Sequence, residues 1–268
     1  MSIHPSAIVD PKAELDRDVE VGPHCVIGPG VRAGPGTRFH AGVIVAGRVI
    51  IGRNNIFHPF SVIGGDPQDL KYHGEDTRVE IGDNNTIREY VTVNKGTAFG
   101  GGVTALGSSN LIMAYVHIAH DCIVKDNIIM GNATTMGGHV TVESWVRLSG
   151  LVGIHHFVTV GEHAFVGGAS KVVTDLPPYM MADGHPLKVR NINQVGLERA
   201  GFSKETVARV RRIYRLIYKE KTNFATLAAG IREGHELYCP EVMNIIRFME
   251  RTEKGVYGRA KEAERSDR

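Results

Sequence analysis

Cysteine is scarce in this chain, and its pattern excludes two common uses. Cys25, Cys122 and Cys239 are far apart and odd in number. They therefore form neither a CxxC metal motif nor a disulfide framework, and we expect a reducing, cytoplasmic setting.

The chain also lacks a segment that could enter a membrane. No apolar stretch approaches the ~18 residues that a membrane helix needs. The N-terminal stretch MSIHPSAIVDPKAEL has no basic start followed by an apolar run, so we expect no signal peptide. The formal net charge is only +2, which provides no global positive field for nucleic acid. We expect neither an integral membrane segment nor a nucleic-acid partner.

Glycine, in contrast, is abundant, with 32 residues in 268, against an ordinary usage of about 7 %. Apolar residues recur at every sixth position, at eleven successive positions from Ile3 to Ile63 and at twelve from Leu106 to Val172. A shorter run in the same step covers 81–93, and glycine often follows the apolar residue. A period of six fits neither an α-helix nor an isolated strand. It is typical of a parallel β-helix in which three hexapeptides make one triangular coil.

The breaks in the period predict the domain organisation. Insertions at about 65–80 and 94–105 leave the prism as loops, and such loops tend to cluster on a binding face. The hexapeptide step stops at Asp175-Leu-Pro-Pro, and a helical period begins after Ser203, which can cap the first helix. We therefore divide the chain into a β-helix over 1–187 and a helical C-terminal domain over 188–268.

Histidines converge on neighbouring coils of the predicted β-helix. Residues 18 apart stack one coil apart, at about 4.8 Å, so that His120, Gly138 and His156 form one column. The other members of the cluster are His117, His139 and His155. Five of the 13 histidines in so small a region predict a functional site.

Three functions are compatible with this cluster. His120 can act as a general base that Asp121 orients, with the Gly138 N–H as a donor to an oxyanion. Three histidines can instead bind zinc, as in a hexapeptide-type carbonic anhydrase, although the spacing of His117 and His120 is poor for that pattern. The third alternative is a non-catalytic scaffold, which would need neither long insertions nor clustered histidines. No Ser or Cys has a partnered base, which favours direct transfer without an acyl-enzyme.

Several stretches closely resemble the UDP-N-acetylglucosamine acyltransferases that start lipid A synthesis. They are IGGDPQDLKYHGEDTRVEIGDNNTIREYVTVNKGT, HIAHDC, GGHV and VGLERAGF, and the resemblance covers essentially the whole chain. It implies an all-β left-handed parallel β-helix with a small α-helical C-terminal domain. It also implies a homotrimer with sites between subunits, no cofactor, no metal, and transfer of a 3-hydroxyacyl chain from acyl carrier protein to a UDP-amino sugar. Another hexapeptide-repeat acyltransferase is the alternative within the same fold.

The resemblance also assigns roles to individual positions. His120 resembles the general base, Asp121 its orienting partner and Gly138 the oxyanion donor. The residues that resemble contacts to the sugar, the acyl chain or the nucleotide, or that support the site, are Gln68, Asp69, Lys71, His117, His139, His155, His156, Asn193 and Arg199. Gly168 resembles the position that ends the acyl groove; since it has no side chain, it predicts a longer donor.

Four positions depart from the family pattern: Asn94, His156, Val195 and Ala200. They concern the nucleotide and the acceptor, and the sequence leaves open whether the acceptor carries a 3-hydroxyl or a 3-amino group. Basic residues are concentrated between Arg199 and Lys221, where we expect acidic acyl carrier protein to dock. A flank that carries Met113, Tyr115 and Trp145 predicts contact with another subunit.

Overall fold

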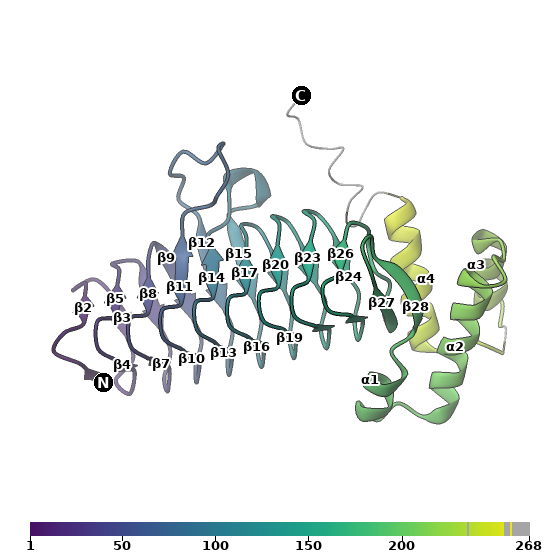
Figure 1. Ribbon diagram of the computed structural model, residues 1–268, viewed down its shortest axis with the longest axis horizontal. Helices are drawn as coiled ribbons and strands as arrows, with labels where there is room; N and C mark the ends of the chain where they lie inside the picture. Colours follow the sequence, from purple (N-terminus) through teal and green to yellow (C-terminus); the bar gives the residue numbers. More distant parts are fainter. Residues whose placement is uncertain (235, 255–257, 259–268) are drawn as a thin grey trace.

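A three-sided parallel β-helix forms most of the molecule, with α-helices at its C-terminal end (Figure 1). The computed structural model describes residues 1–234, 236–254 and 258. Strands of successive complete coils pair through residues 18 apart, as Thr135 does with Gly153. The predicted left-handed parallel β-helix with C-terminal helices is confirmed.

Each coil contributes one short strand to each of three sheets. The first sheet contains β1 (Ser2–Ile3), β4 (Glu20–Val21), β7 (Arg38–Phe39), β10 (Ile56–Phe57), β13 (Thr86–Ile87), β16 (Leu111–Ile112), β19 (Ile129–Met130), β22 (Arg147–Leu148), β25 (Phe165–Val166), β27 (Met180–Asp183) and β28 (Lys188–Ile192). The second contains β2 (Ile8–Val9), β5 (Val26–Ile27), β8 (Ile44–Val45), β11 (Val62–Gly65), β14 (Thr92–Asn94), β17 (His117–Ile118), β20 (Thr135–Met136), β23 (Gly153–Ile154) and β26 (Lys171–Val172). The third contains β3 (Glu14–Leu15), β6 (Val31–Ala33), β9 (Arg48–Ile51), β12 (Arg78–Ile81), β15 (Val103–Leu106), β18 (Ile123–Val124), β21 (Thr141–Val142) and β24 (Thr159–Val160).

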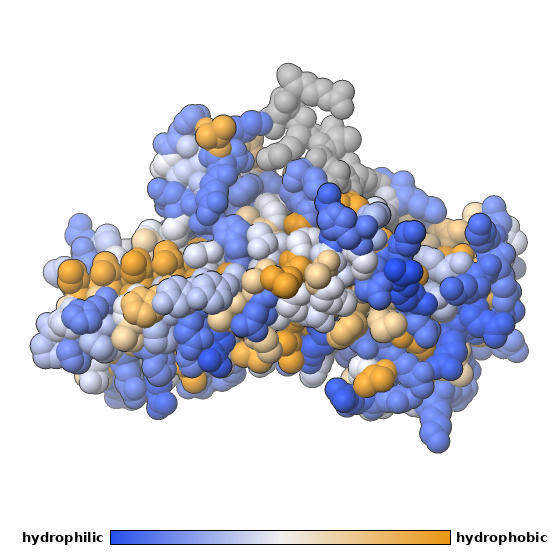
Figure 2. Space-filling view, in the orientation of Figure 1, coloured by the Kyte–Doolittle hydropathy of each residue, from blue (hydrophilic) through white to orange (hydrophobic). Residues whose placement is uncertain are grey.

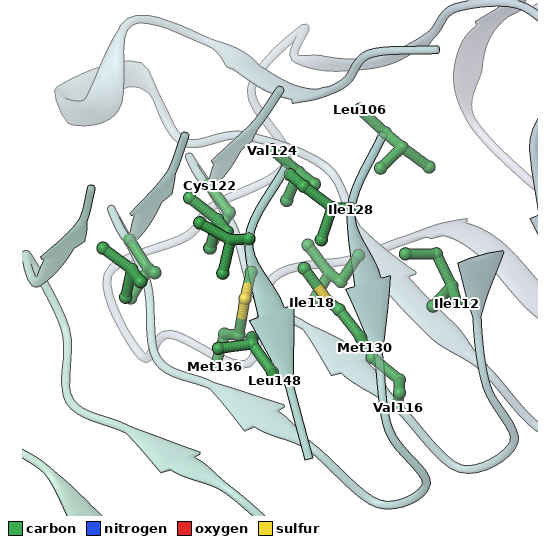
Figure 3. Close-up of a cluster of buried hydrophobic side chains, with 14 of the residues drawn as sticks. Leu106, Ile112, Val116, Ile118, Cys122, Val124, Ile128, Met130, Met136 and Leu148 are labelled. Atoms are coloured by element: carbon green, nitrogen blue, oxygen red, sulfur yellow. The ribbon is translucent and has the colours of Figure 1, made fainter. Parts of the chain in front are cut away.

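The aliphatic residues of the six-residue step fill the interior of the prism. Ile112, Ile118 and Met130 are at most 1 % exposed, and Figure 3 shows them among the side chains of the buried cluster. Burying one such side chain fully is worth about 1.5–3 kcal/mol. Because the column continues from coil to coil, this burial holds the stack together and fixes the phase of every residue outside it.

The corners of the prism repeat a backbone conformation that is unusual outside glycine. Asp121, His139 and Phe157 occupy the corner between the second and third sheets in three successive coils, with φ of 59°, 62° and 64°. A single left-handed residue turns the chain sharply. The spacing of 18 then places these three side chains in a column at one corner.

Two loops project from the same side of the prism (Figure 1). The first insertion, residues 66–77, connects β11 to β12, and the second, residues 95–102, connects β14 to β15 and contains the short 3₁₀-helix η1 (Ala98–Gly100). Lys95 of the second insertion pairs with Asp66 of the first, at 2.9 Å between Nζ and Oδ1. The two insertions are therefore fastened to each other at their bases.

Within the described residues, four helices follow the prism: α1 (Gln194–Arg199), α2 (Lys204–Tyr218), α3 (Phe224–Arg232) and α4 (Pro240–Glu253). Ser203 caps α2 through its hydroxyl, as its sequence context predicts. Neither α1 nor the antiparallel hairpin of β27 and β28 was expected from the sequence. This hairpin continues the first sheet across the predicted boundary at 187, so the division into two domains there remains a prediction.

An apolar strip lies on the outer surface at the N-terminal end of the prism. Figure 2 shows it over β2, β5 and β8, where Ile8, Val26 and Ile44 are 67 %, 39 % and 38 % exposed. At a neighbouring corner the half-exposed rings of Phe60, Tyr90 and Tyr115 stack in a row, with centroids 5.3 and 5.0 Å apart. Across the described residues, no helix is long and apolar enough to span a bilayer.

Candidate active site

A surface pocket of about 390 Å³ lies between the first insertion and the histidine-bearing corner. It is lined by Gln68, Asp69, Leu70, Lys71, His120, Gly138, His139 and His156. The column of residues 18 apart and the tip of the first insertion thus meet at one place. Seven of the thirteen residues assigned to the site from the sequence lie in this lining, and an eighth, Asp121, lies directly behind it.

His120 and Asp121 form a hydrogen-bonded pair at the centre of the pocket. The His120 Nδ1 is 2.8 Å from the Asp121 Oδ2, and both side chains are buried, at 11 % and 0 % exposed. An ionised carboxylate only accepts hydrogen bonds, so Nδ1 carries the proton in this pair. In neutral His120 the lone pair is then on Nε2, which faces the pocket side where Asp69 Oδ2 lies 3.9 Å away.

Asp121 remains ionised despite its burial. Burial alone would raise the pKa of this carboxyl, but hydrogen bonds from His120 and Thr97 outweigh it and bring the pKa below its usual value. Thr97 donates its backbone N–H to Oδ1 at 2.8 Å and its hydroxyl to Oδ2 at 2.6 Å. Asp121 therefore presents a fixed negative charge to His120.

Gly138 lies directly against the ring of His120. A Cβ at this position would lie 2.4 Å from the His120 Cε1 and 2.6 Å from Nε2. Any side chain there would displace the imidazole, so glycine is required by close approach. Among the described residues, no hydrogen-bond acceptor is assigned to the Gly138 N–H, while its carbonyl accepts from Phe157 N at 3.1 Å. This N–H is available to a ligand beside His120.

The other histidines surround this pair in different ways. His139 packs edge-on to His120, stacks on Phe157 with centroids 4.4 Å apart, and has Nε2 3.7 Å from Asp121 Oδ2. His117 Nδ1 is 2.7 Å from the Thr92 hydroxyl. Burial, and secondly the proximity of His120, lower the pKa of His117, which favours its neutral form. His155 and His156 pack against each other, with ring centroids 3.8 Å apart.

The first insertion brings its polar residues to the pocket through a turn that closes on itself. The Lys71 N–H donates to Asp69 Oδ1 at 3.0 Å, and Tyr72 N donates to the Asp69 carbonyl at 3.0 Å. Lys95 lies over the Tyr72 ring at 5.3 Å and is only 12 % exposed. Gln68 is exposed in the same pocket. Lys95 was not among the residues assigned from the sequence, because its partners lie in an insertion without periodicity.

Three assigned residues lie away from this pocket within one chain. Asn193 and Arg199 line a second pocket with Trp145 and Arg147, near the start of α1. The Asn193 amide caps α1 by accepting from Gly196 N at 3.1 Å and donates to the His163 carbonyl at 2.8 Å. Gly168 is exposed and lies next to Gly150, at a different corner of the prism from His120. The roles of Gly168, Asn193 and Arg199 remain predictions.

The side chains around His120 also include potential metal ligands. Within the described part of the chain, the potential ligand group comprises His120, Asp121 and His139, whose donor atoms lie within 4.8 Å of one another. It does not contain the three histidines that the zinc alternative requires. The oxygens of Asp121 already accept from Thr97 and His120. This arrangement suits a hydrogen-bonded pair better than a ligand set.

Cys122 is adjacent to the pair but points into the core. It is fully buried, its Sγ lies 3.2 Å from the Gly137 carbonyl, and burial raises the pKa of its thiol to about 12. A thiol that holds its proton so firmly is inert as a nucleophile.

A histidine paired with a buried carboxylate, beside a glycine N–H and on a hexapeptide β-helix, defines an acyltransferase of the hexapeptide-repeat class. The family model "Udp N-acetylglucosamine O-acyltransferase; Domain 2" matches residues 175–257. The chain is 42 % identical to the acyl-(acyl-carrier-protein)–UDP-N-acetylglucosamine O-acyltransferase of Verminephrobacter eiseniae over 216 residues, 80 % of this chain and 82 % of that one. The Aliivibrio fischeri protein of the same name is 45 % identical, over 73 % of this chain and 74 % of its own.

Solved structures agree over nearly the full length. LpxA from Acinetobacter baumannii superposes with a TM-score of 0.90 at 41 % identity, covering 93 % of this chain and 97 % of that one. The UDP-N-acetylglucosamine acyltransferase from Bacteroides fragilis gives a TM-score of 0.90 at 36 % identity, covering 94 % and 98 %. The chain belongs to the family of UDP-N-acetylglucosamine O-acyltransferases, as its sequence motifs indicate.

Proposed function

We propose that this protein transfers a 3-hydroxyacyl chain from acyl carrier protein to the 3-position of UDP-linked N-acetylglucosamine, the first step of lipid A synthesis. The observation that carries the proposal is the His120–Asp121 pair beside Gly138, in the pocket that the first insertion overhangs. The family relationship supports the two substrates, because its members are named for them.

The geometry supports general base catalysis. His120 Nε2 takes the proton from the sugar 3-hydroxyl while the oxygen of that hydroxyl attacks the thioester carbonyl. The Gly138 N–H donates to the oxyanion of the tetrahedral intermediate, where a donor is worth about 2.7–4 kcal/mol. When the carbon–sulfur bond breaks, the His120 imidazolium returns the proton to the departing thiolate. Asp121 stabilises that imidazolium through Nδ1, and no acyl-enzyme is required.

The remaining assigned residues suit the two substrates in different ways. Gln68, Asp69 and Lys71 approach the pocket from the first insertion, where amide, carboxylate and ammonium groups can bind the sugar hydroxyls and the carrier arm. His139 and His156 line the wall nearest the base. Their polar atoms can hold the acceptor within the ~3–3.5 Å needed for attack.

We further propose that the active form is a homotrimer with sites between subunits. The exposed aromatic row of Phe60, Tyr90 and Tyr115 and the apolar strip over β2, β5 and β8 leave large apolar areas uncovered. Tyr115 and Trp145 lie at the two corners bordering the first sheet, 61 % and 41 % exposed, with Met113 half-buried nearby. A subunit interface also lets Gly168, Asn193 and Arg199 of one chain reach the His120 pocket of another.

The decisive experiment is acyl transfer by purified wild type and His120→Ala, with carrier-protein thioesters of graded length and both 3-hydroxyl and 3-amino UDP-sugars. We expect His120→Ala to lose on the order of 10²-fold or more in kcat while it melts at the wild-type temperature. Transfer by the variant within a few-fold of wild type contradicts the proposal. The two sugars decide the acceptor, and sedimentation of the same samples decides the trimer.

The zinc alternative is separated by chelation. We expect transfer to continue unchanged after exhaustive treatment with EDTA or dipicolinate, because the Asp121 oxygens are occupied by hydrogen bonds. Stoichiometric zinc that is lost together with activity would instead support a metal-dependent enzyme.

A further inference from the structure

The second insertion holds the carboxylate behind the proposed base. Its residue Thr97 is 4 % exposed and contacts Asp121 across 24 positions of sequence. Two donors of this single residue meet the carboxylate, the N–H at Oδ1 and the hydroxyl at Oδ2. The hydroxyl therefore shares Oδ2 with His120 Nδ1.

The direction of the hydroxyl's hydrogen bond is fixed by a second contact. Thr97 Oγ1 accepts from Gly100 N at 3.2 Å, as the cap of η1. Since a hydroxyl has one proton, and ionised Asp121 cannot donate, that proton points to Asp121 Oδ2. A chain of hydrogen bonds then runs from Gly100 N–H through Thr97 and Asp121 to His120.

Glycines allow the second insertion to close over the carboxylate. A Cβ on Gly100 would lie 1.9 Å from Asp121 Cγ, and one on Gly96 would lie 2.9 Å from Oδ1. With these two glycines around Thr97, the backbone seals the carboxylate so that it is 0 % exposed. A buried carboxylate with all its strong contacts supplied by the protein cannot rotate without losing several hydrogen bonds at once.

We propose that Thr97 is a positioning residue for the reaction: it locks Asp121 in the orientation that holds His120 in its Nδ1-protonated form, aimed at the pocket. This inference rests on the proposed function. Thr97 acts through Asp121, and it is not among the residues that line the pocket. It also sets how much negative charge Asp121 Oδ2 presents to His120, because a hydroxyl that donates to an oxygen weakens that oxygen as an acceptor for a second donor.

Other titratable groups face the pair and are unchanged by a substitution at Thr97. Asp69 approaches His120 Nε2 to 3.9 Å from the first insertion, and His139 approaches Asp121 Oδ2 to 3.7 Å from the next coil. His117 lies on the same coil as His120, and burial lowers the pKa of His117, which favours its neutral form. A variant that removes only the Thr97 hydroxyl therefore isolates that hydrogen bond.

The test compares Thr97→Val with Thr97→Ser and with a matched control, Thr37→Val. Thr37 is also buried, and its hydroxyl donates to the Gly52 carbonyl at 3.0 Å, far from the pocket. We expect Thr97→Val to lower kcat on the order of tenfold or more, with the KM of both substrates within about threefold, since misorientation affects the transition state more than binding. Thr97→Ser keeps the donor and should restore at least half of the wild-type rate.

The pH profile distinguishes positioning from a loss of stability. Removing the hydroxyl leaves Asp121 Oδ2 a stronger acceptor for His120, which favours the imidazolium, so the acidic limb of kcat/KM should move to higher pH. Thr37→Val should keep the wild-type profile even if it melts earlier. If Thr97→Val does not fold, Thr97→Ala is measured in its place, with the same direction expected in both readouts.

These experiments distinguish a failure of the proposed function from a failure of the proposed role of Thr97. If wild type transfers no acyl group, or His120→Ala retains transfer, the proposed function fails. If those two behave as proposed but the Thr97 variant matches Thr37→Val in kcat and in pH profile, the positioning role of Thr97 is overturned and the proposed function stands.

Discussion

Gly138→Ala tests whether the site depends on the close approach of a backbone to the base. The new Cβ would lie 2.4 Å from the His120 Cε1 and 2.9 Å from Nδ1. Ordinary carbon contacts begin near 3.5 Å, so the imidazole or the coil must shift by about 1 Å. A displacement of this size in a reacting group can cost on the order of 10²-fold in rate, which corresponds to ~2.7 kcal/mol of activation free energy.

The variant separates position from hydrogen bonding. Alanine keeps the backbone N–H that we assign to the oxyanion. A loss of activity would therefore result from displacement of the His120 imidazole. We expect kcat to fall on the order of 10²-fold, with a smaller change in the KM for the UDP-sugar. Single-turnover acyl transfer with saturating donor measures the chemical step directly.

Gly22→Ala is the matched control. Its Cβ would lie 2.9 Å from the Phe39 carbonyl oxygen, a clash with the backbone toward the N-terminal end of the prism. We expect it to lower the melting temperature without changing kcat. The reasoning is refuted if Gly138→Ala is folded and its kcat stays within about threefold of wild type, or if Gly22→Ala loses as much activity.

Three further predictions concern the carrier protein, the acyl chain and pH. Reversing charge at Arg212 and Arg215, which line a pocket between α1 and α2 with Lys204, should raise the KM for acyl carrier protein and flatten its salt dependence; unchanged values leave these arginines as solvated surface. Gly168→Met should shift donor preference toward shorter chains, measured with graded thioesters, since each buried methylene is worth about 0.8 kcal/mol; an unmoved profile excludes Gly168 as the end of the groove. Burial lowers the pKa of His163 to about 4, so the unfolded chain binds a proton there between pH 6.5 and 4 that the folded chain does not. The free energy of unfolding should therefore fall by up to ~3 kcal/mol as pH drops through that window, and urea denaturation of His163→Leu should lose that part of the pH dependence.

The hexapeptide period was sufficient to predict the β-helix and the meeting of residues from different coils. A repeat of 18 residues per turn is a local property, because each aliphatic residue that enters the core fixes the phase of the next. His120, Gly138 and His156 therefore share a pocket as their spacing predicts. The caps of α2 and α3 were equally local, since Ser203 and Asn223 bond within three residues.

The resemblance to a family assigned functional roles to residues that the hexapeptide repeat alone does not single out. It drew attention to Gln68, Asp69 and Lys71 in an insertion that, by composition alone, is a solvated charged loop. In the structure all three residues line the pocket beside His120. Gly168, Asn193 and Arg199 lie elsewhere in the single chain, so the part in the site that we propose for them requires the proposed second subunit.

The sequence by itself determined the coil, its core and the column of residues along one corner, because these follow from side chains that alternate between inside and outside at a fixed step. Only the tertiary structure decided what lies against that column. Thr97 reaches Asp121, and Lys95 reaches Asp66, through insertions whose paths depend on glycine clearances and on hydrogen bonds to distant strands. The hairpin of β27 and β28 likewise depends on a partner, because it pairs with the edge that β25 leaves open. Contacts of this kind join residues at no regular spacing, so they can be recognised only in the folded chain.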